Sequence, residues 1–151
     1  MTAREKKIII AAVVVVVCVP LVFVGVMVGA AVVGYRAAMR AGSEAATIQN
    51  LKTVGAIEAQ YFLTHNRTFG TLDQLIKEQE LSQKFSGHPV VADGYVFTLS
   101  VAPKPNGSSS YKITADPEPG LSGAQHFYLD SDDNRIRVNP DHQAGPTDPS
   151  N

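Results

Sequence analysis

The sequence predicts an α+β fold in which one long N-terminal helix packs on an antiparallel sheet of about four strands. Three observations predict it. The chain opens with an apolar run, Ile8 to Gly34, that contains no charged residue. Apolar residues then recur every three or four positions, which is typical of an amphipathic helix. From Tyr95 the apolar period changes to two, which is typical of strands. A chain of 151 residues accommodates one such domain with short appendages.

The apolar run predicts a transmembrane helix over residues 8–35. A bilayer core about 30 Å thick is crossed by about 20 helical residues, and this run is longer. Basic residues precede it, so we expect a cytoplasmic N-terminus over residues 1–7 and a C-terminal part outside the cytoplasm. The alternative is a cleaved secretory signal. Because the apolar region of such a signal has about 7–15 residues, the length of this run favours an uncleaved anchor.

Small residues within the run predict a surface for helix packing. Gly25 and Gly29 are four residues apart, as are Ala30 and Gly34. Pairs of small residues at this spacing let two helices in a membrane approach closely. These four positions are therefore our candidates for contacts with other helices.

The helix is expected to continue beyond the run, because no proline or other strong breaker separates residues 36–64 from it. The predicted helix is then more than fifty residues long. Its second half has one apolar stripe that we expect to bind the helix to the sheet. The stripe consists of Ile48, Leu51, Val54, Ile57 and Tyr61. Glu44 and Glu58 are expected on the solvated face of this helix, where ion pairs contribute little.

Shorter elements follow. Thr71 and Gln74 form a capping box, which predicts a small helix from Leu72 to about Leu81. Alternating residues predict strands in GYVFTLSVAP and SYKITADP, joined at an Asn-Gly turn, and two more in HFYLDSDDNRIRV. The folded domain is thus expected over residues 36–138. The polar, Pro-rich segment 139–151 is expected to be disordered.

One acidic turn is a candidate metal site. Asp130, Asp132 and Asn134 alternate like the first ligands of a calcium loop. Calcium takes six to eight oxygen ligands, and an EF-hand loop also contains a glycine and a closing glutamate. Neither follows here, so the sequence favours an acidic hairpin turn, and we predict no metal and no cofactor.

Other chemistry has no clear signature. The four histidines, His65, His88, His126 and His142, are scattered without the spacing of zinc ligands. The only cysteine lies in the apolar run, and no serine is placed beside a base, so an enzyme is not expected. From Arg36 onward ten Lys and Arg stand against thirteen Asp and Glu, a net charge of −3. No basic patch predicts nucleic-acid binding.

Several phrases of the sequence resemble a known family. SEAATIQNLKTVGAIEAQYF resembles the exposed half of the first helix of bacterial type IV pilins and type II secretion pseudopilins, and NRTFGTLDQL resembles the loop after it. DGYVFTLSV, SYKITADP and HFYLDSDDNRIRV resemble their strands, in the same order, so the resemblance covers about residues 36–139. It implies a structural subunit of a pilus-like or pseudopilus-like assembly. Such a subunit is anchored in the bacterial inner membrane, with its C-terminal domain periplasmic or extracellular and with other pilin-like subunits as partners.

The N-terminus departs from the family pattern. Pilins have a leader that ends in Gly followed by Phe or Met, and a glutamate shortly inside the apolar run. Here no glutamate occurs between Ile8 and Gly34, and no Gly-Phe junction precedes the run. Two alternatives therefore stay open. The first is a non-polymerising, single-pass membrane protein whose pilin-like domain binds a ligand or partner, and the second is an anchored hydrolase for which the sequence nominates no catalytic side chain.

Overall fold

The computed structural model describes the backbone of residues 3–78, 80–121 and 123–151. Side chains are described at 26, 27 and 29 and, within those ranges, from 31 onward. The chain forms two compact units, Met1–Met39 and Arg40–Asn151.

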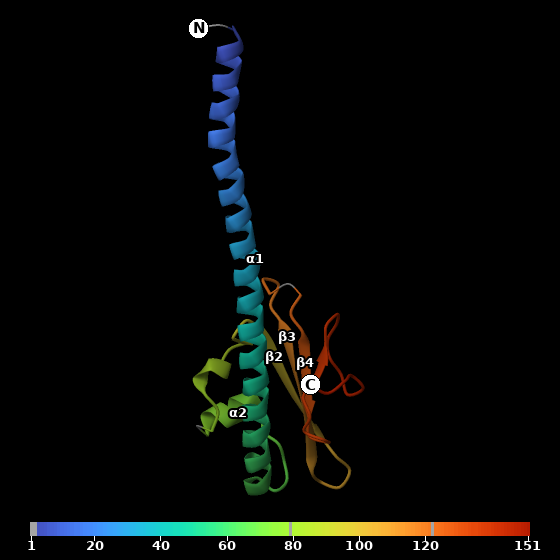
Figure 1. The fold of residues 1–151 in the computed structure, drawn as a ribbon. Helices are drawn as coiled ribbons and strands as arrows, with labels where there is room; N and C mark the ends of the chain where they lie inside the picture. The colour runs from blue at the N-terminus through green and yellow to red at the C-terminus, as the bar shows by residue number, and fades with distance from the viewer. Residues whose placement is uncertain (1–2, 79, 122) are drawn as a thin grey trace. The chain divides into compact units, whose positions relative to one another are not determined.

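Helix α1, Ala3–Thr64, has 62 residues and contributes to both units (Figure 1). Its length agrees with the absence of a strong breaker after the apolar run. The predicted membrane span, 8–35, and the predicted cytoplasmic segment, 1–7, lie mostly outside the described side chains. Within the described part of the chain, no helix combines the length and the apolar character needed to cross a bilayer.

The sheet is a five-stranded antiparallel meander in the order β1-β2-β3-β4-β5. Its strands are β1 Val90–Ala92, β2 Tyr95–Pro103, β3 Ser109–Pro117, β4 His126–Asp130 and β5 Arg137–Asn139. The predicted number, about four, is one too low because β1 has only three residues. A tight turn joins β1 to β2, in which Asp93 and Gly94 both have positive φ, 53° and 82°. An Asp-Gly pair favours this kind of hairpin turn.

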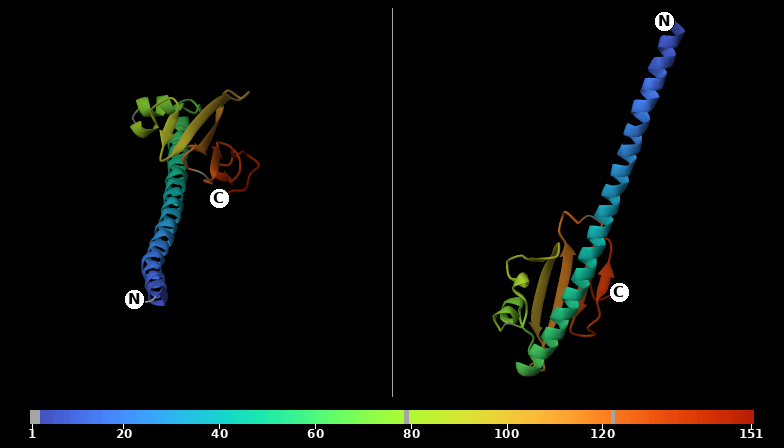
Figure 2. Two further views of the ribbon diagram at one scale, coloured as in Figure 1. Left: turned by 90° about the horizontal axis from the view of Figure 1, so that it is seen from above. Right: turned by 60° about the vertical axis from the view of Figure 1, so that its left-hand side comes forward.

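Helix α1 and the sheet enclose one core in the second unit. Figures 1 and 2 show the later part of α1 running along one face of the sheet. Alternate residues of β2 and β3 point toward the helix, and Tyr95, Ile113 and Ala115 are fully buried. An α+β arrangement of this kind buries the apolar stripe of the helix against the apolar face of the sheet.

Two short helices close one side of this core. Helix α2, Leu72–Lys77, begins at the predicted capping box. Gln74 N donates to Thr71 Oγ1 at 3.3 Å, and Thr71 N donates to Gln74 Oε1 at 2.8 Å. The helix ends four residues before the predicted Leu81, and a 3₁₀ turn, η1 Gln83–Phe85, follows. Leu75 and Phe85 bring these turns into the core.

The segment 139–151, which the sequence predicts to be disordered, is ordered and packs beside β5. Val138 N donates to Pro149 O at 3.0 Å, and Asn151 N donates to Ile136 O at 2.9 Å. Arg137 and Ser150 form an isolated antiparallel bridge, and Ala144 is buried. The prediction rested on polar composition, whereas backbone pairing and one small apolar residue hold this segment in place.

Candidate functional site

The first unit has an exposed apolar surface on α1. Val26 is 65% exposed, Met27 59% and Val33 70%. Gly29 and Gly34, two of the predicted packing positions, are open, since a Cβ placed on either would have no atom within 4 Å. The other two, Gly25 and Ala30, lie outside the described side chains. Apolar side chains and bare glycine backbone thus share this stretch of helix.

The predicted apolar stripe of α1 lies in the core of the second unit. Leu51 and Val54 are fully buried and Tyr61 is 6% exposed. Ile48 and Ile57 are partly buried and pack against the same core. The stripe joins the helix to the sheet along much of the length that the two share.

Gly55 is a residue of this contact that the apolar pattern does not identify. A Cβ at this position would lie 3.0 Å from Asn134 Oδ1, 3.2 Å from Leu129 Cδ2 and 3.3 Å from Tyr111 Oη. These distances are tighter than ordinary van der Waals contact, so the absence of a side chain allows α1 to approach β3 and β4 closely. Gly55 follows Val54 directly, and this adjacency is the only sequence signal for its role.

Glu58 is buried, whereas its charge predicts a position on the solvated face of the helix. Its side chain is 0% exposed, and its Oε2 accepts a hydrogen bond from Gly70 N at 2.9 Å. Burial raises the pKa of Glu58 from 4.5 to about 7, the Gly70 hydrogen bond opposes this rise, and the charge of Glu80 adds to it. The spacing of the sequence indicates this burial, because Glu58 is four residues after Val54 and three before Tyr61 and therefore lies on the same side of the helix as the apolar stripe.

A second polar contact joins α1 to the hairpin of β1 and β2. Asn50 is 6% exposed, and its Nδ2 donates to Asp93 Oδ2 at 2.8 Å. Lys84 Nζ donates to Asn50 Oδ1 at 2.7 Å and lies 3.4 Å from Asp93 Oδ2. The hydrogen bond from Asn50 and, more weakly, the charge of Lys84 hold the pKa of Asp93 below its usual value. This contact fixes the β1–β2 turn against the helix.

The three side chains of the candidate calcium site make hydrogen bonds and an ion pair within the protein. Asp130 Oδ1 accepts from the backbone N of Asp132 at 3.0 Å and of Asp133 at 3.4 Å. The Asp132 carboxylate lies 3.1 Å from Lys104 Nζ, and Asn134 Oδ1 accepts from Tyr111 Oη at 3.2 Å. Within the described residues, no three His, Cys, Asp or Glu side chains are grouped to hold a metal ion. These contacts are those of an acidic hairpin turn.

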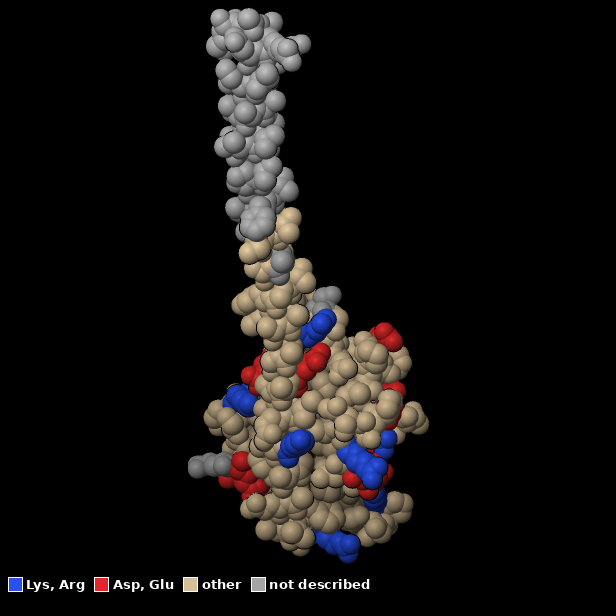
Figure 3. Space-filling view, viewed as in Figure 1, with Lys and Arg blue, Asp and Glu red and all other residues tan. Residues whose placement is uncertain are grey.

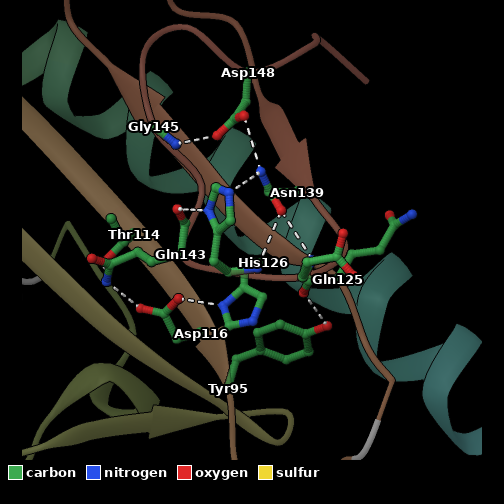
Figure 4. A network of polar contacts seen from close by, with 11 residues as sticks. Tyr95, Thr114, Asp116, Gln125, His126, Asn139, Gln143, Gly145 and Asp148 are labelled. Atoms are coloured by element: carbon green, nitrogen blue, oxygen red, sulfur yellow. Dashed lines mark hydrogen bonds and ion pairs between the residues drawn. The ribbon is translucent and has the colours of Figure 1, made fainter.

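Polar side chains connect the C-terminal segment to the outer face of the sheet (Figure 4). His126 Nδ1 lies 2.7 Å from Asp116 Oδ1, and Gln143 Nε2 donates to Asp116 Oδ2 at 2.6 Å. Asp148 accepts from Asn139 Nδ2 at 3.0 Å and from Gly145 N at 2.8 Å. The His126–Asp116 pair therefore belongs to a set of polar contacts that joins residues 139–148 to β3 and β4.

The remaining histidines are also used locally. His65 Nε2 lies 3.2 Å from Glu78 Oε2 and the ring stacks on Tyr61, with the centroids 3.7 Å apart. His88 lies 3.7 Å from Asp73 and His142 contacts Asn139. The four histidines therefore do not converge on one another in the described structure.

The surface of the second unit has mixed charge. Figure 3 shows basic and acidic side chains interspersed on the visible face of this unit.

No family model, curated protein or solved structure matches the chain. The features that bear on function are the exposed helix of the first unit and the helix–sheet contact of the second.

Proposed function

We propose that this chain is a structural subunit of a type IV pilus-like or type II secretion pseudopilus-like assembly. In this proposal the subunit is anchored in the bacterial inner membrane by its N-terminal helix, and the Arg40–Asn151 unit lies outside the cytoplasm. The observation that carries the proposal is a set of exposed large apolar side chains on α1 between Val26 and Met39. This set overlaps the end of the charge-free run, Ile8 to Gly34.

Exposure of this kind favours lipid or another helix as the neighbour of α1. Soluble monomers rarely leave a contiguous stretch of large apolar side chains in water. The exposed large apolar residues of this stretch are Val26, Met27, Val32, Val33, Tyr35 and Met39. Open glycines at 29 and 34 leave room for the backbone of a second helix.

The second unit supports the same proposal because its core is complete. Helices α1 and α2 and the sheet enclose Leu51, Leu75 and Phe127, all fully buried. In this proposal the second unit is the folded exported domain, and no catalytic role is assigned to it. Helix packing and membrane anchoring are therefore the roles that the proposal assigns, and no cofactor enters it.

A non-polymerising anchored protein is the second candidate. It is favoured by one specific observation, the absence of a glutamate between Ile8 and Gly34. In pilins that glutamate helps to align subunits during assembly. In this alternative α1 contacts lipid only, and the second unit binds a ligand or partner.

Alkaline extraction of membranes tests the anchor. The full chain is expected to stay with the bilayer, and a Val26→Arg, Val33→Arg variant is expected to be released in larger part. An arginine costs roughly 2.5–3.5 kcal/mol at the centre of a membrane helix on insertion scales and less toward its ends, so the change at Val26 is expected to contribute more to release than the change at Val33. The matched control carries Thr53→Arg and Ala56→Arg, which are exposed positions on α1 in the second unit, and it is expected to behave like the parent chain. Release of the parent chain itself would contradict the proposal.

Electron micrographs of cells that overproduce the chain separate the two candidates. Filaments that bind an antibody against the second unit are expected for a subunit. Persistent monomers after chemical crosslinking would favour the non-polymerising alternative.

A further inference from the structure

Glu58 is a buried carboxyl group with only one hydrogen bond. Its Oε2 accepts from Gly70 N at 2.9 Å. Its Oε1 is buried and has no hydrogen-bond partner among the described residues. The whole side chain is 0% exposed. An ionised carboxylate in such a place loses its hydration without a full set of compensating contacts.

A second carboxyl group lies in the same electrostatic environment. Glu80 Oε2 is also buried and has no partner among the described residues. The Glu80 backbone is fixed, since its N donates to Leu75 O at 3.0 Å. Among the described residues, no Lys, Arg or His forms an ion pair with Glu58 or Glu80. Because like charges disfavour ionisation, the charge of Glu80 opposes the ionisation of Glu58.

The other groups around Glu58 do not neutralise it. Tyr61 on α1 and Tyr111 on β3 are electrostatically coupled to Glu58, and each has a raised pKa through burial first and then through neighbouring carboxylates. Glu78 adds another negative charge near Tyr61. His65 is the basic group of this region, but its Nε2 pairs with Glu78 at 3.2 Å. The surroundings of Glu58 are thus apolar, phenolic or acidic.

Gly70 makes the Glu58 hydrogen bond structurally important. A Cβ at Gly70 would lie 2.9 Å from Leu75 Cδ2 and 3.3 Å from the Tyr61 ring. The loop that follows α1 therefore passes very close to both α1 and α2. The Glu58 carboxyl group is the contact that holds its backbone from the helix side.

We propose that Glu58 is a proton-binding site that couples pH to the packing of residues 65–81 against α1. In its neutral form Glu58 accepts a hydrogen bond from Gly70 N and adds no charge to the core. Ionisation strengthens that hydrogen bond, but it also places a buried charge, repelled by Glu80, in a site without a cation. Because the cost of burial is larger than the effect of the Gly70 hydrogen bond, the loop and α2 then pack less tightly.

The sign of the effect follows from the raised pKa. The unfolded chain has a Glu58 pKa of 4.5, and burial, with a smaller contribution from Glu80, raises it to about 7 in the folded chain. Between these values the folded state holds a proton that the unfolded state has lost, so stability falls as pH rises through this window. Below pH 4.5 and above about pH 7 this group leaves stability unchanged with pH.

A titration of the unaltered full chain, kept in solution with a mild detergent, tests the proposal. With ¹³C-labelled glutamate, one carboxyl resonance is expected to titrate more than one pH unit above the ordinary glutamate value of about 4.3. The Gly70 amide is expected to exchange at least about tenfold faster at pH 8 than at pH 5.5 after correction for the intrinsic rate, since a one-unit shift corresponds to a factor of ten. Titration of every glutamate near 4.3, or equal protection of Gly70 at both pH values, would overturn the proposal.

Three variants assign the effect. Glu58→Gln keeps an acceptor for Gly70 N and is expected to abolish both the high-pH titration and the pH dependence of Gly70 exchange. Glu80→Gln is expected to lower the pKa of Glu58 in part, because burial remains. Glu118→Gln, a half-buried glutamate after β3, is the matched control and is expected to leave both readouts unchanged. If Glu58→Gln retains the high-pH resonance, the titrating group is another glutamate and the proposal is wrong.

Discussion

Gly55 determines how closely α1 approaches the sheet. Any side chain there would press on Leu129 of β4, on Tyr111 of β3 and on Asn134 in the turn between β4 and β5. Gly42, on the same helix, has nothing within 4 Å of the position of a Cβ. The two glycines have the same intrinsic effect on the helix but differ in their surroundings, so they form a natural pair for comparison.

We predict that Gly55→Val lowers the free energy of unfolding by about 1–3 kcal/mol, the usual cost of inserting methyl groups into a packed core. Gly42→Val is expected to change stability little, because valine is a slightly better helix former than glycine and meets no neighbour. Denaturant unfolding of the two variants beside the parent chain measures the difference. Equal stability of the two variants would show that α1 does not lie this close to the sheet.

Asn50 is the second residue on which the helix–sheet contact depends. Its side-chain Nδ2 donates a hydrogen bond to Asp93 Oδ2, and its Oδ1 accepts one from Lys84 Nζ. Asn50→Ala leaves a carboxylate and an ammonium group without this partner, so we predict a loss of about 1–3 kcal/mol of stability. Gln49→Ala, at the adjacent exposed position, is the control and is expected to lose little. Thermal unfolding measures both, and a loss of equal size at the two positions would refute the role of Asn50.

At the scale of elements, one aspartate adds to the backbone pairing that holds the C-terminal segment. Asp148 accepts from Gly145 N and Asn139 Nδ2, and its backbone O accepts from Arg137 Nη1. The hydrogen bonds from Gly145 and then Asn139 lower the pKa of Asp148. A lowered pKa means that the aspartate supports the segment above the ordinary aspartate pKa, about 3.9, and that this support is lost as pH falls through the lowered value.

Asp148→Ala is therefore predicted to loosen residues 139–151 without unfolding the sheet. Backbone amides of this segment should exchange faster, while those of β2 and β3 stay protected. Asp141→Ala, an exposed aspartate in the same segment, serves as the control. Unchanged exchange of the segment in Asp148→Ala would contradict the assigned role.

The sequence predicts those elements whose signal is local. The capping box of Thr71 and Gln74 and the strands β2 and β3 follow from short-range patterns, and the structure has them at or near the expected residues. Strand β1 was missed because three residues are too few for an alternating pattern. The ordering of residues 139–151 depends on pairing with β5, and composition does not reveal pairing.

The buried residues divide in the same way. Leu51 and Val54 follow from apolar spacing, because apolar residues on one face of a helix are buried with it. The spacing places Glu58 on that same face, but its charge predicts a position on the solvated face of the helix. What overrides the charge is tertiary, namely the Gly70 N–H at 2.9 Å and the raised pKa that accompanies burial.

At the scale of the whole molecule, the described side chains of the first unit are exposed, whereas the second unit encloses a core. The second unit has its own core and is expected to fold without the first. We predict that a chain beginning at residue 40 is soluble and retains the circular dichroism of a helix and sheet, whereas the full chain stays with membranes. Aggregation of the shortened chain would show that the apolar part of α1 contributes to the fold of the second unit.

The central claim is that the exposed apolar part of α1 packs against the same helix in other copies. Disulfide crosslinking in native membranes tests it most directly, with single cysteines at Gly29→Cys and Met27→Cys in a chain that carries Cys18→Ala. Successive residues of a helix are about 100° apart, so positions 27 and 29 face nearly opposite directions. We predict covalent dimers, with the higher yield at the small-residue position 29 and none in the cysteine-free parent. Monomers at both positions would contradict self-packing and leave α1 as an anchor that contacts lipid alone.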